Sequence, residues 1–275
     1  MGTCGFIEYR RCLLDNHVKQ IYGLVGNGST DPLYAGLEGG SVWDAVIKTK
    51  ENPQGVLALA NEIVAYKLAA AADIPMPASG IAIIDSETDG QGLVTEASWG
   101  HCFYSERIDK AVIAIPSSLS SVRDPLLFAR IILFDHLIYN KDRNLGNLLI
   151  TIRRGVKKLY VIDHTHVFKN QTIWDAGCLR RGILENDYQD TAIMELNGYV
   201  GFTENARIDL DLLREAARVF ETRYTSLMID EAIENIPNDW TVRQDDLCAL
   251  KEYLEYRVRH IDEICNVVDE WIRRC

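Results

Sequence analysis

Apolar residues in the first third of the chain fall into short runs that turn-forming residues separate. Gly, Asn, Asp and Pro stand between the runs, and a run of this length between such residues is typical of a β-strand. Five strands are therefore predicted, at residues 18–25, 33–36, 42–48, 79–84 and 93–95.

A longer run, rich in alanine and leucine, lies between the third and fourth of these strands. It begins at Asn52 and Pro53, a favoured N-cap and a favoured first helical residue, and it reaches about Ala72. Alanine and leucine are strong helix formers, and Pro75 and Pro77 end the run. This pattern predicts one helix among the strands.

The second part of the chain has a helical pattern. Residues 125–139 are apolar at almost every position, so a helix here would be buried on all sides. Apolar residues recur every three or four positions over 247–268, which predicts an amphipathic helix of about 30 residues. Shorter elements are predicted between them: a hairpin of 148–152 and 159–162, an irregular segment at 164–184, and helices within 185–200, 209–222 and 225–236.

These elements divide the chain into two parts of different character. Residues 1–98 are predicted to form an N-terminal lobe with an antiparallel sheet and one helix, and residues 99–275 a mainly helical C-terminal lobe. The mixed segment at 96–104 would join them. The expected fold class is α+β, with a cleft shared by the two lobes.

Composition excludes several classes of function. Apolar residues make up 47% and charged residues 25% of the 275-residue chain, as in a globular protein. The net charge of −11 provides no overall basic field for nucleic acid or an anionic membrane, so neither partner is expected. The basic stretch at 153–158 is interpreted as a solvated hairpin tip. The most apolar segment is too short to cross a bilayer.

The seven cysteines are scattered and form no CxxC motif, which argues against a disulfide framework and against a zinc site. The first residues are charged and contain no apolar core run, so no signal peptide is expected. Both features suit a protein of the reducing cytoplasm.

The strongest chemical signal is the polar loop after the apolar helix. Transfer of a phosphoryl group from ATP requires a carboxylate near the attacking hydroxyl, and oxygen ligands that hold Mg²⁺ against the phosphates. Asp142 is the predicted catalytic carboxylate. Asn147, and Asp163 at the end of the predicted hairpin, are the predicted metal ligands. Arg143 is grouped with the catalytic residues, because it could brace the loop by pairing with a phosphate or a carboxylate.

An ordinary turn also contains Asp and Asn, so the spacing alone does not decide between a turn and a catalytic loop. The apolar helix before the loop and the apolar strand that ends in Ile-Asp favour the catalytic interpretation. His164 and His166 form an HxH pair, but no third nitrogen or sulfur ligand is near, and His164 is interpreted as a loop-positioning residue.

Lys48 and Glu62 are candidates for an ion pair in the nucleotide site. Lys48 ends an apolar strand, and Glu62 lies in the helix that follows. In kinases a strand lysine binds the α- and β-phosphates, and a helix glutamate holds it in position. The alternative is a strand-end lysine in water and a surface glutamate.

The loop at 26–32 is a candidate phosphate-binding loop. Gly26 and Gly28 would allow the backbone to approach a phosphate, and Ser29 and Thr30 would add hydroxyl donors. Taken alone, such a loop is more often an ordinary turn. Glu96 and Ala97 are predicted to offer backbone groups to adenine, on their position between the lobes alone.

In this order, the motifs resemble a HipA-like kinase domain and, more distantly, phosphatidylinositol kinases and protein kinases. The resembling pieces are residues 26–33, 46–48, 61–69, 74–77, 134–149, 159–164 and 236–240. The catalytic loop reads Asn-Lys-Asp where protein kinases have His-Arg-Asp, and the metal loop reads Ile-Asp-His where they have Asp-Phe-Gly. The N-terminal extension of full-length HipA toxins is not recognised.

The resemblance implies a two-lobed kinase fold with ATP and Mg²⁺ in the cleft, and serine/threonine kinase activity. It assigns Lys48 and Glu62 to the ion pair, Asp142 to catalysis, and Asn147 and Asp163 to the metal. HipA proteins act as bacterial toxins that often pair with a DNA-binding antitoxin, so an antitoxin or regulatory protein is a candidate partner. Some members phosphorylate their own glycine loop, which here contains Ser29 and Thr30.

The leading hypothesis is therefore an ATP- and Mg²⁺-dependent kinase that phosphorylates a serine or threonine of an unidentified protein. One alternative keeps the fold without catalysis, as a nucleotide-binding pseudokinase that serves as an interaction module. Another alternative moves the phosphate acceptor to a lipid or a small molecule.

Overall fold

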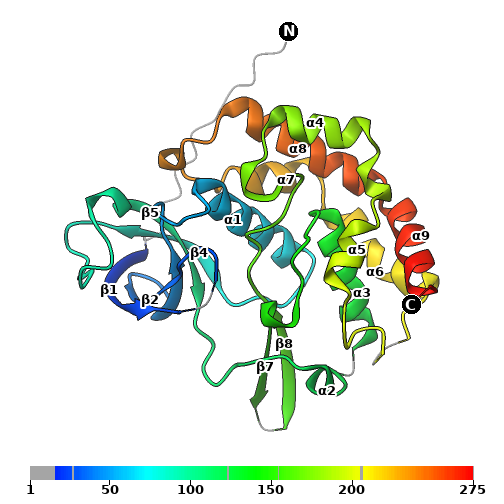
Figure 1. The fold of residues 1–275 in the computed structure, drawn as a ribbon, viewed down its shortest axis with the longest axis horizontal. Coiled ribbons are helices and arrows are strands. Elements are labelled where there is room, and N and C mark those ends of the chain that lie inside the picture. The colour runs from blue at the N-terminus through cyan, green and yellow to red at the C-terminus, as the bar shows by residue number, and fades with distance from the viewer. Residues whose placement is uncertain (1–15, 27, 123, 154, 205–206, 275) are drawn as a thin grey trace.

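The computed structural model of the protein describes residues 16–26, 28–122, 124–153, 155–204 and 207–274 (Figure 1). Residues 1–15 of the expected N-terminal lobe and Asn27 of the glycine loop lie outside the described residues.

Five strands close into a barrel at the start of the described chain. They are β1 (Asn16–Leu24), β2 (Leu33–Glu38), β3 (Asp44–Lys48), β4 (Ser79–Ile84) and β5 (Gly100–Glu106). Their order is β1-β2-β3-β5-β4, and each neighbouring pair is antiparallel except β1 and β4. β1 and β4 run parallel, through Asn16↔Ala82 and His17↔Ile83. The predicted antiparallel sheet thus closes on itself through one parallel pair.

The interior of the barrel follows from the alternation of side chains along its strands. Successive side chains point to opposite faces of a strand, and the inward set is apolar. The buried side chains of this cluster are Val18, Ile21, Leu33, Ala35, Leu37, Val42, Ala45, Ile47, Ala82, Ile84, Cys102 and Tyr104.

The fifth barrel strand lies later in the chain than the sequence predicted. Residues 93–95 form no strand, whereas 100–106 do. The centre of β5 is the buried run at 102–104, but glycine, histidine and serine on either side obscure this run in the sequence. The lobe boundary expected after residue 98 therefore falls before a barrel strand.

Helix α1 (Val56–Ala71) connects the barrel to the rest of the molecule. It is the predicted helix, but its N-cap is Gly55. Asn52 serves the preceding turn, where its Nδ2 donates to the carbonyls of Thr49 and Gly55 at 2.7 and 3.1 Å. Most of the buried apolar residues of α1 belong to the main hydrophobic core, and none belongs to the barrel interior; they are Leu59, Ala60, Ile63, Val64, Ala65, Leu68 and Ala69.

The main core surrounds α3 (Pro125–Leu137), the apolar helix of the sequence prediction. Asp124 caps this helix, because its carboxylate accepts a hydrogen bond from the backbone N–H of Leu127 at 2.9 Å. The other helices of the described chain are α2 (Pro116–Leu119), α4 (Ala176–Leu184), α5 (Ala192–Asn197), α6 (Leu210–Arg223), α7 (Ser226–Ile233), α8 (Gln244–Arg259) and α9 (Ile261–Ile272).

Two helices of the C-terminal part differ from the prediction. Part of the segment expected to be irregular forms α4, which Asp175 caps by accepting from the backbone of Cys178 at 2.7 Å. The single long helix expected at the end of the chain is broken at His260 into α8 and α9. The break lets α9 pack against α3 and α6 while α8 packs against α4 and α7.

The predicted hairpin is present and belongs to a second, three-stranded sheet. Its strands are β6 (Val112–Ile113), β7 (Leu148–Arg153) and β8 (Val156–Val161), with β7 in the centre. The β7–β8 hairpin projects from the body of the molecule (Figure 1). Among the described residues, no helix combines the length and apolar character that a membrane span requires.

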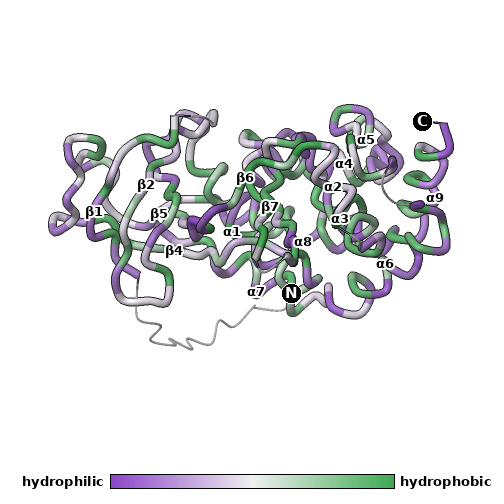
Figure 2. Tube along the Cα trace, turned by 90° about the horizontal axis from the view of Figure 1, so that it is seen from below, coloured by the Kyte–Doolittle hydropathy of each residue, from purple (hydrophilic) through white to green (hydrophobic). Residues whose placement is uncertain are grey.

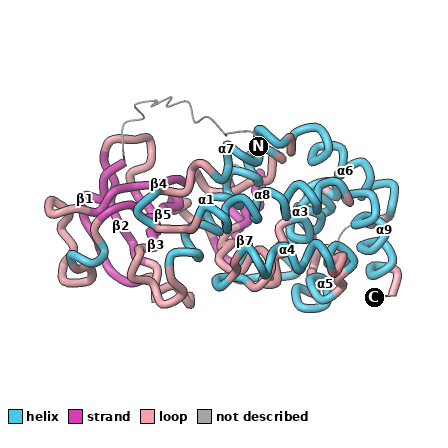
Figure 3. Tube along the Cα trace, turned by 90° about the horizontal axis from the view of Figure 1, so that it is seen from above, coloured by secondary structure: helices cyan, strands magenta, loops and turns pink. Residues whose placement is uncertain are grey.

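The molecule is elongated, as the two views in Figures 2 and 3 show. The barrel strands lie at one end, α6 and α9 lie at the other, and α1 and β7 lie between them. Between the two ends of the molecule, Lys48 at the end of β3 lines the same cleft as Asn147, which directly precedes β7.

Candidate active site

A cleft of about 880 Å³ brings together five of the twelve predicted site residues. Lys48, Glu62, Asn147, Asp163 and Gly28 all line it. They come from the barrel, from α1 and from the two ends of the β7–β8 hairpin. The fold thus brings together residues that lie more than a hundred positions apart in the chain.

Lys48 lies at the centre of a buried ion-pair cluster. Its Nζ forms an ion pair with Glu62 Oε1, and it donates to Asp163 Oδ1 at 3.0 Å and to Thr165 Oγ1 at 2.8 Å. Lys48 is 7% exposed and Glu62 is 2% exposed. Burial therefore excludes the alternative of a solvated strand-end lysine and a surface glutamate.

The charges of this cluster stabilise one another. Burial disfavours the charged form of Lys48, but the carboxylates of Glu62 and Asp163 outweigh burial and raise its pKa. Burial likewise opposes the ionisation of Asp163, and Lys48 outweighs it and lowers the pKa of Asp163. Burial raises the pKa of Glu62, an effect that Lys48 opposes. With both carboxylates ionised, the cluster has one more negative than positive charge and attracts a further cation.

The predicted catalytic loop is held by its own asparagines. Asn147 Nδ2 donates to the backbone carbonyl of Asp142 at 2.6 Å and to its Oδ2 at 3.2 Å, and Asn144 Nδ2 donates to Asp142 Oδ1 at 2.8 Å. Asp142 does not itself line the cleft, but it contacts Asn147, which does. Because Asn147 uses its nitrogen for Asp142, its amide oxygen is left for another ligand.

Arg143 lies inside the protein and not in the cleft. Its guanidinium donates to Asp135 of α3, with Nε 3.0 Å from Oδ2, and its Nη1 donates to the carbonyls of Asn147 and Ile162 at 3.1 and 3.0 Å. Its side chain is fully buried. Arg143 thus has one of its two predicted partners, the carboxylate of Asp135, and its hydrogen bonds join the two loops.

His164 completes this buried network. Arg143 Nη2 lies 2.7 Å from His164 Nε2, and because arginine can only donate, Nε2 accepts and the hydrogen is on Nδ1. Burial, and then the charge of Arg143, hold the pKa of His164 well below its usual value. A neutral ring engaged in this way agrees with a loop-positioning role and leaves no free nitrogen pair for a metal.

The glycine loop reaches across the cleft to the segment after Asp163. Gly26 and Gly28 have φ angles of 82° and 117°, a backbone region that favours glycine. Ser29 Oγ is 3.4 Å from His166 Nε2. Thr30 is only 2% exposed, so of the two predicted hydroxyl donors Ser29 alone is exposed.

Glu96 and Ala97 do not reach the cleft. They lie in a short, exposed 3-10 helix that Thr95 caps, before β5 begins. The cleft is instead lined by the segment at 105–111, which follows from β5. The prediction for Glu96 and Ala97 and the missed strand have the same cause. The segment that joins the two parts follows β5, and β5 was not recognised in the sequence.

Sequence reasoning missed Asn61, a polar residue next to Glu62 in the apolar helix α1. Asn61 is fully buried, and its Nδ2 donates to the carbonyls of Thr165 and Gln171 at 2.7 and 3.1 Å. Its Oδ1 accepts from Trp174 Nε1 at 2.8 Å. Asn61 thus anchors the segment after Asp163 to α1. In the sequence, the signal for this role was a polar residue within a run of alanines and leucines.

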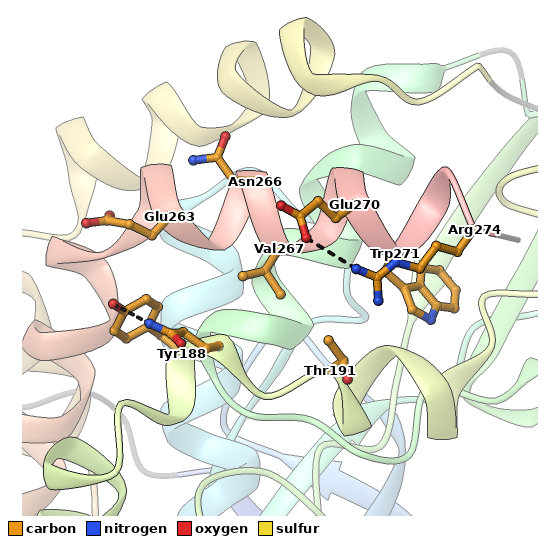
Figure 4. Close-up of a pocket in the computed structure, with 9 residues that line it drawn as sticks. Tyr188, Thr191, Glu263, Asn266, Val267, Glu270, Trp271 and Arg274 are labelled. Carbon is orange, nitrogen blue, oxygen red and sulfur yellow. Dashed lines mark hydrogen bonds and ion pairs between the residues drawn. The ribbon is translucent and has the colours of Figure 1, made fainter.

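A second cavity, of about 400 Å³, contains none of the predicted site residues. It lies between α9 and the segment at 188–191, with Tyr188 near one end and Trp271 near the other (Figure 4). Its carboxylates are partly engaged, because Glu270 pairs with Arg274 at 3.4 Å. The larger cleft is therefore the candidate active site.

Comparisons with known proteins give a family match and likenesses to solved structures. The sequence matches the family model described as HipA-like kinase over residues 18–178, more than half of the chain. No curated protein matches the sequence significantly.

The solved structures that match this chain include a kinase and a chain of a toxin–antitoxin complex. The proinflammatory kinase CtkA of Helicobacter pylori has a TM-score of 0.59 at 10% sequence identity, over 94% of this chain and 97% of that chain. A chain in the complex of HipA, HipB and operator DNA from the toxin–antitoxin system of Shewanella oneidensis MR-1 has a TM-score of 0.45 at 13% identity, over 92% of this chain and 67% of that chain. At its identity, the likeness to CtkA shows a shared mixed α/β fold alone.

The Asp135–Arg143 pair predicts a large effect on stability. Asp135→Ala leaves a buried guanidinium without its carboxylate, which should lower the free energy of unfolding by about 3–5 kcal/mol. Urea denaturation measures the loss. Asp230→Ala removes a partly exposed partner of Lys251 and should cost less than about 1 kcal/mol. Equal losses in the two variants would contradict the structural importance of the buried pair.

The contacts of Asn61 predict a local effect on the segment at 165–174. Asn61→Ala leaves buried carbonyls and an indole N–H without partners, which should cost about 1–3 kcal/mol and expose this segment to limited proteolysis. Mass spectrometry of the fragments locates the cleavage. Asn235→Ala, which removes a partly exposed asparagine far from this segment in the chain, is the control. An unchanged cleavage pattern in Asn61→Ala would show that the segment is held without Asn61.

Proposed function

Because the chain belongs to the HipA-like kinase family, we propose that it transfers the γ-phosphoryl group of ATP to a serine or threonine hydroxyl of a protein. The observation that carries the proposal is the buried Lys48–Glu62–Asp163 cluster, with Asn147 in the same cleft. In this proposal the barrel with α1 is the N-terminal lobe, and the helical part with the second sheet is the C-terminal lobe.

Lys48, Glu62 and Asp142 each have a place in the proposed reaction. The Lys48 ammonium binds the α- and β-phosphates, and Glu62 keeps it in the cleft. The acceptor hydroxyl oxygen bonds to the γ-phosphorus, the bond from that phosphorus to the β-phosphate oxygen breaks, and ADP leaves. Asp142 takes the hydroxyl proton, and its hydrogen bonds from Asn144 and Asn147 hold the carboxylate in one orientation.

The residues of the cleft fit a magnesium ion. Asn147 offers an amide oxygen and Asp163 a carboxylate, which are the hard ligands that Mg²⁺ prefers. No group of three or more His, Cys, Asp or Glu side chains among the described residues is arranged to hold a metal. This small donor set suits Mg²⁺, because the ion usually keeps several waters and substrate phosphate oxygens as ligands. When bound, Mg²⁺ neutralises charge on the phosphates.

The nucleotide base is proposed to lie at the barrel side of the cleft. Val46, Met76 and Phe103 provide apolar walls there, and the backbone at 105–111 takes the place expected for Glu96 and Ala97. In the loop between β1 and β2, Gly28 allows close approach to the phosphates, and Ser29 adds an exposed hydroxyl.

The complete set of polar groups favours catalysis over a pseudokinase. Lys48, Asp142, Asn147 and Asp163 are all present, and each has a partner that orients it. The exposed Ser29 is a candidate for self-phosphorylation, whereas the buried Thr30 is not accessible. By family resemblance, a regulatory protein or an antitoxin is a proposed partner.

A radiolabelled ATP assay with protein and lipid acceptors tests the proposal. Asp142→Ala should lower phosphate transfer by about 10²–10⁴-fold while ATP still binds, because the variant loses only the proton acceptor. Asp163→Asn should also retain ATP binding and lose Mg²⁺-dependent transfer. Asp211→Ala, an exposed carboxylate on α6, is the control and should behave as wild type.

Three results would contradict the proposal in different ways. Binding of ATP without transfer by the wild-type protein would favour the pseudokinase. Labelling of lipid alone would exclude a protein acceptor. Transfer near the wild-type rate in Asp163→Asn would remove Asp163 from the metal site.

A further inference from the structure

Both ends of the β7–β8 hairpin are connected to the candidate active site. β7 begins at Leu148, directly after Asn147, and β8 leads back to Asp163 through Ile162. The backbone N–H of Ile162 donates to the carbonyl of Asn147 at 3.0 Å, so the two ends of the hairpin are tied together at the cleft. A six-residue strand at 3.3 Å per residue carries the tip about 20 Å from these residues.

The base and the tip of the hairpin differ in burial. Leu148, Ile150, Leu159 and Val161 belong to the main hydrophobic core and are nearly fully buried. Towards the tip, Ile152 is 62% exposed and Val156 is 61% exposed. The base therefore anchors the hairpin, whereas the apolar side chains at the tip contribute little to the core of this chain.

The tip is also the most basic stretch of an acidic chain. Residues 153–158 contain four basic residues and no acidic one, whereas the chain has a net charge of −11. No carboxylate among the described residues lies within ion-pair distance of Lys157 or Lys158. The positive charges of Lys157 and Lys158 are thus not neutralised by a described side chain.

Each face of the hairpin, near its tip, carries an apolar residue and a lysine. Ile152 pairs with Lys157 across the strands, so these two side chains share one face. Val156 and Lys158 lie two positions apart on β8 and share the other face. Each face thus presents one exposed branched apolar side chain and one lysine, which suits insertion between segments of a partner.

We propose that the hairpin tip, formed by Ile152, Val156, Lys157 and Lys158, docks an acidic, partly apolar segment of the acceptor protein. This role rests on the proposed kinase function. The acceptor protein would contact the cleft through its hydroxyl and the hairpin tip through its acidic segment. At about 3.3 Å per residue, the acidic segment would lie about six residues from the phosphorylated hydroxyl in an extended chain.

Charge complementarity favours a protein over the other anionic partners. A membrane surface or a polynucleotide is anionic over a wide area, and the acidic remainder of this chain would be repelled by it. An acidic peptide segment meets only the tip. The two exposed apolar side chains also have a use against a protein segment, and none against phosphate groups.

Peptide binding tests the docking role separately from catalysis. The probe is a fluorescent synthetic peptide with one serine and a leucine-containing run of glutamates about six residues away, and a matched peptide has glutamine in place of each glutamate. With the Asp142→Ala protein, fluorescence anisotropy should show tighter binding of the acidic peptide. Lys157→Glu with Lys158→Glu should weaken it by about tenfold or more, and Ile152→Ser with Val156→Ser should also weaken it.

A second pair of charge reversals serves as the control. Lys19→Glu with Arg207→Glu makes the same change in net charge at exposed positions outside the hairpin and should leave peptide binding unchanged. Equal binding of the two peptides, or equal weakening by both pairs of variants, would overturn the docking role. Binding of anionic vesicles or an oligonucleotide in place of the acidic peptide, with the same dependence on Lys157 and Lys158, would also overturn it.

Kinetics of the wild-type protein separate this inference from the proposed function. If the docking role holds, the KM for the acidic acceptor rises in Lys157→Glu with Lys158→Glu, while the KM for ATP and the kcat stay near wild type. Peptide binding without any transfer would contradict the kinase and leave the docking surface standing. Transfer with the same KM for both peptides would support the kinase and contradict the docking surface.

Discussion

The buried ion pair between Asp135 and Arg143 is the contact on which the geometry of the candidate active site depends. Asp135 belongs to α3, the helix at the centre of the main core, and the guanidinium of Arg143 connects it to both polar loops. A buried charge is tolerated only with a partner and with its hydrogen bonds satisfied, so the pair has few alternative arrangements. Arg143 therefore holds the backbone of Asn147, one proposed metal ligand, and of Ile162, which precedes the other, Asp163.

A second buried arginine, Arg257, binds His136, the residue of α3 that follows Asp135. Arg257 of α8 is fully buried, forms an ion pair with Asp187, and lies 2.9 Å from His136 Nδ1. It also donates to the carbonyls of His136 and Leu137 at 2.6 and 3.0 Å. Consecutive residues at the end of α3 thus bind one arginine that orders the proposed catalytic loop and another that holds α8 against α3.

The Lys48 cluster depends on a different constraint, the position of α1. Glu62 can reach Lys48 because α1 packs into the main core, whereas Lys48 comes from the barrel. Asn61 binds the segment after Asp163 at the same time. One helix therefore connects the barrel, the main core and the segment after Asp163.

The sequence by itself determined the elements whose patterns are local, together with the order of the chemical residues along the chain. Strand alternation, proline and N-cap signals, and the continuous apolar run of α3 depend only on neighbouring residues, and so does the spacing of Asp142 and Asn147. Only the tertiary structure decided where β5 closes the barrel, why the last helix breaks at His260, and which partners Arg143 and Asn61 bind. These features depend on contacts between distant segments, and the free energy of burying a charge or an amide is determined by those contacts, which no local pattern records.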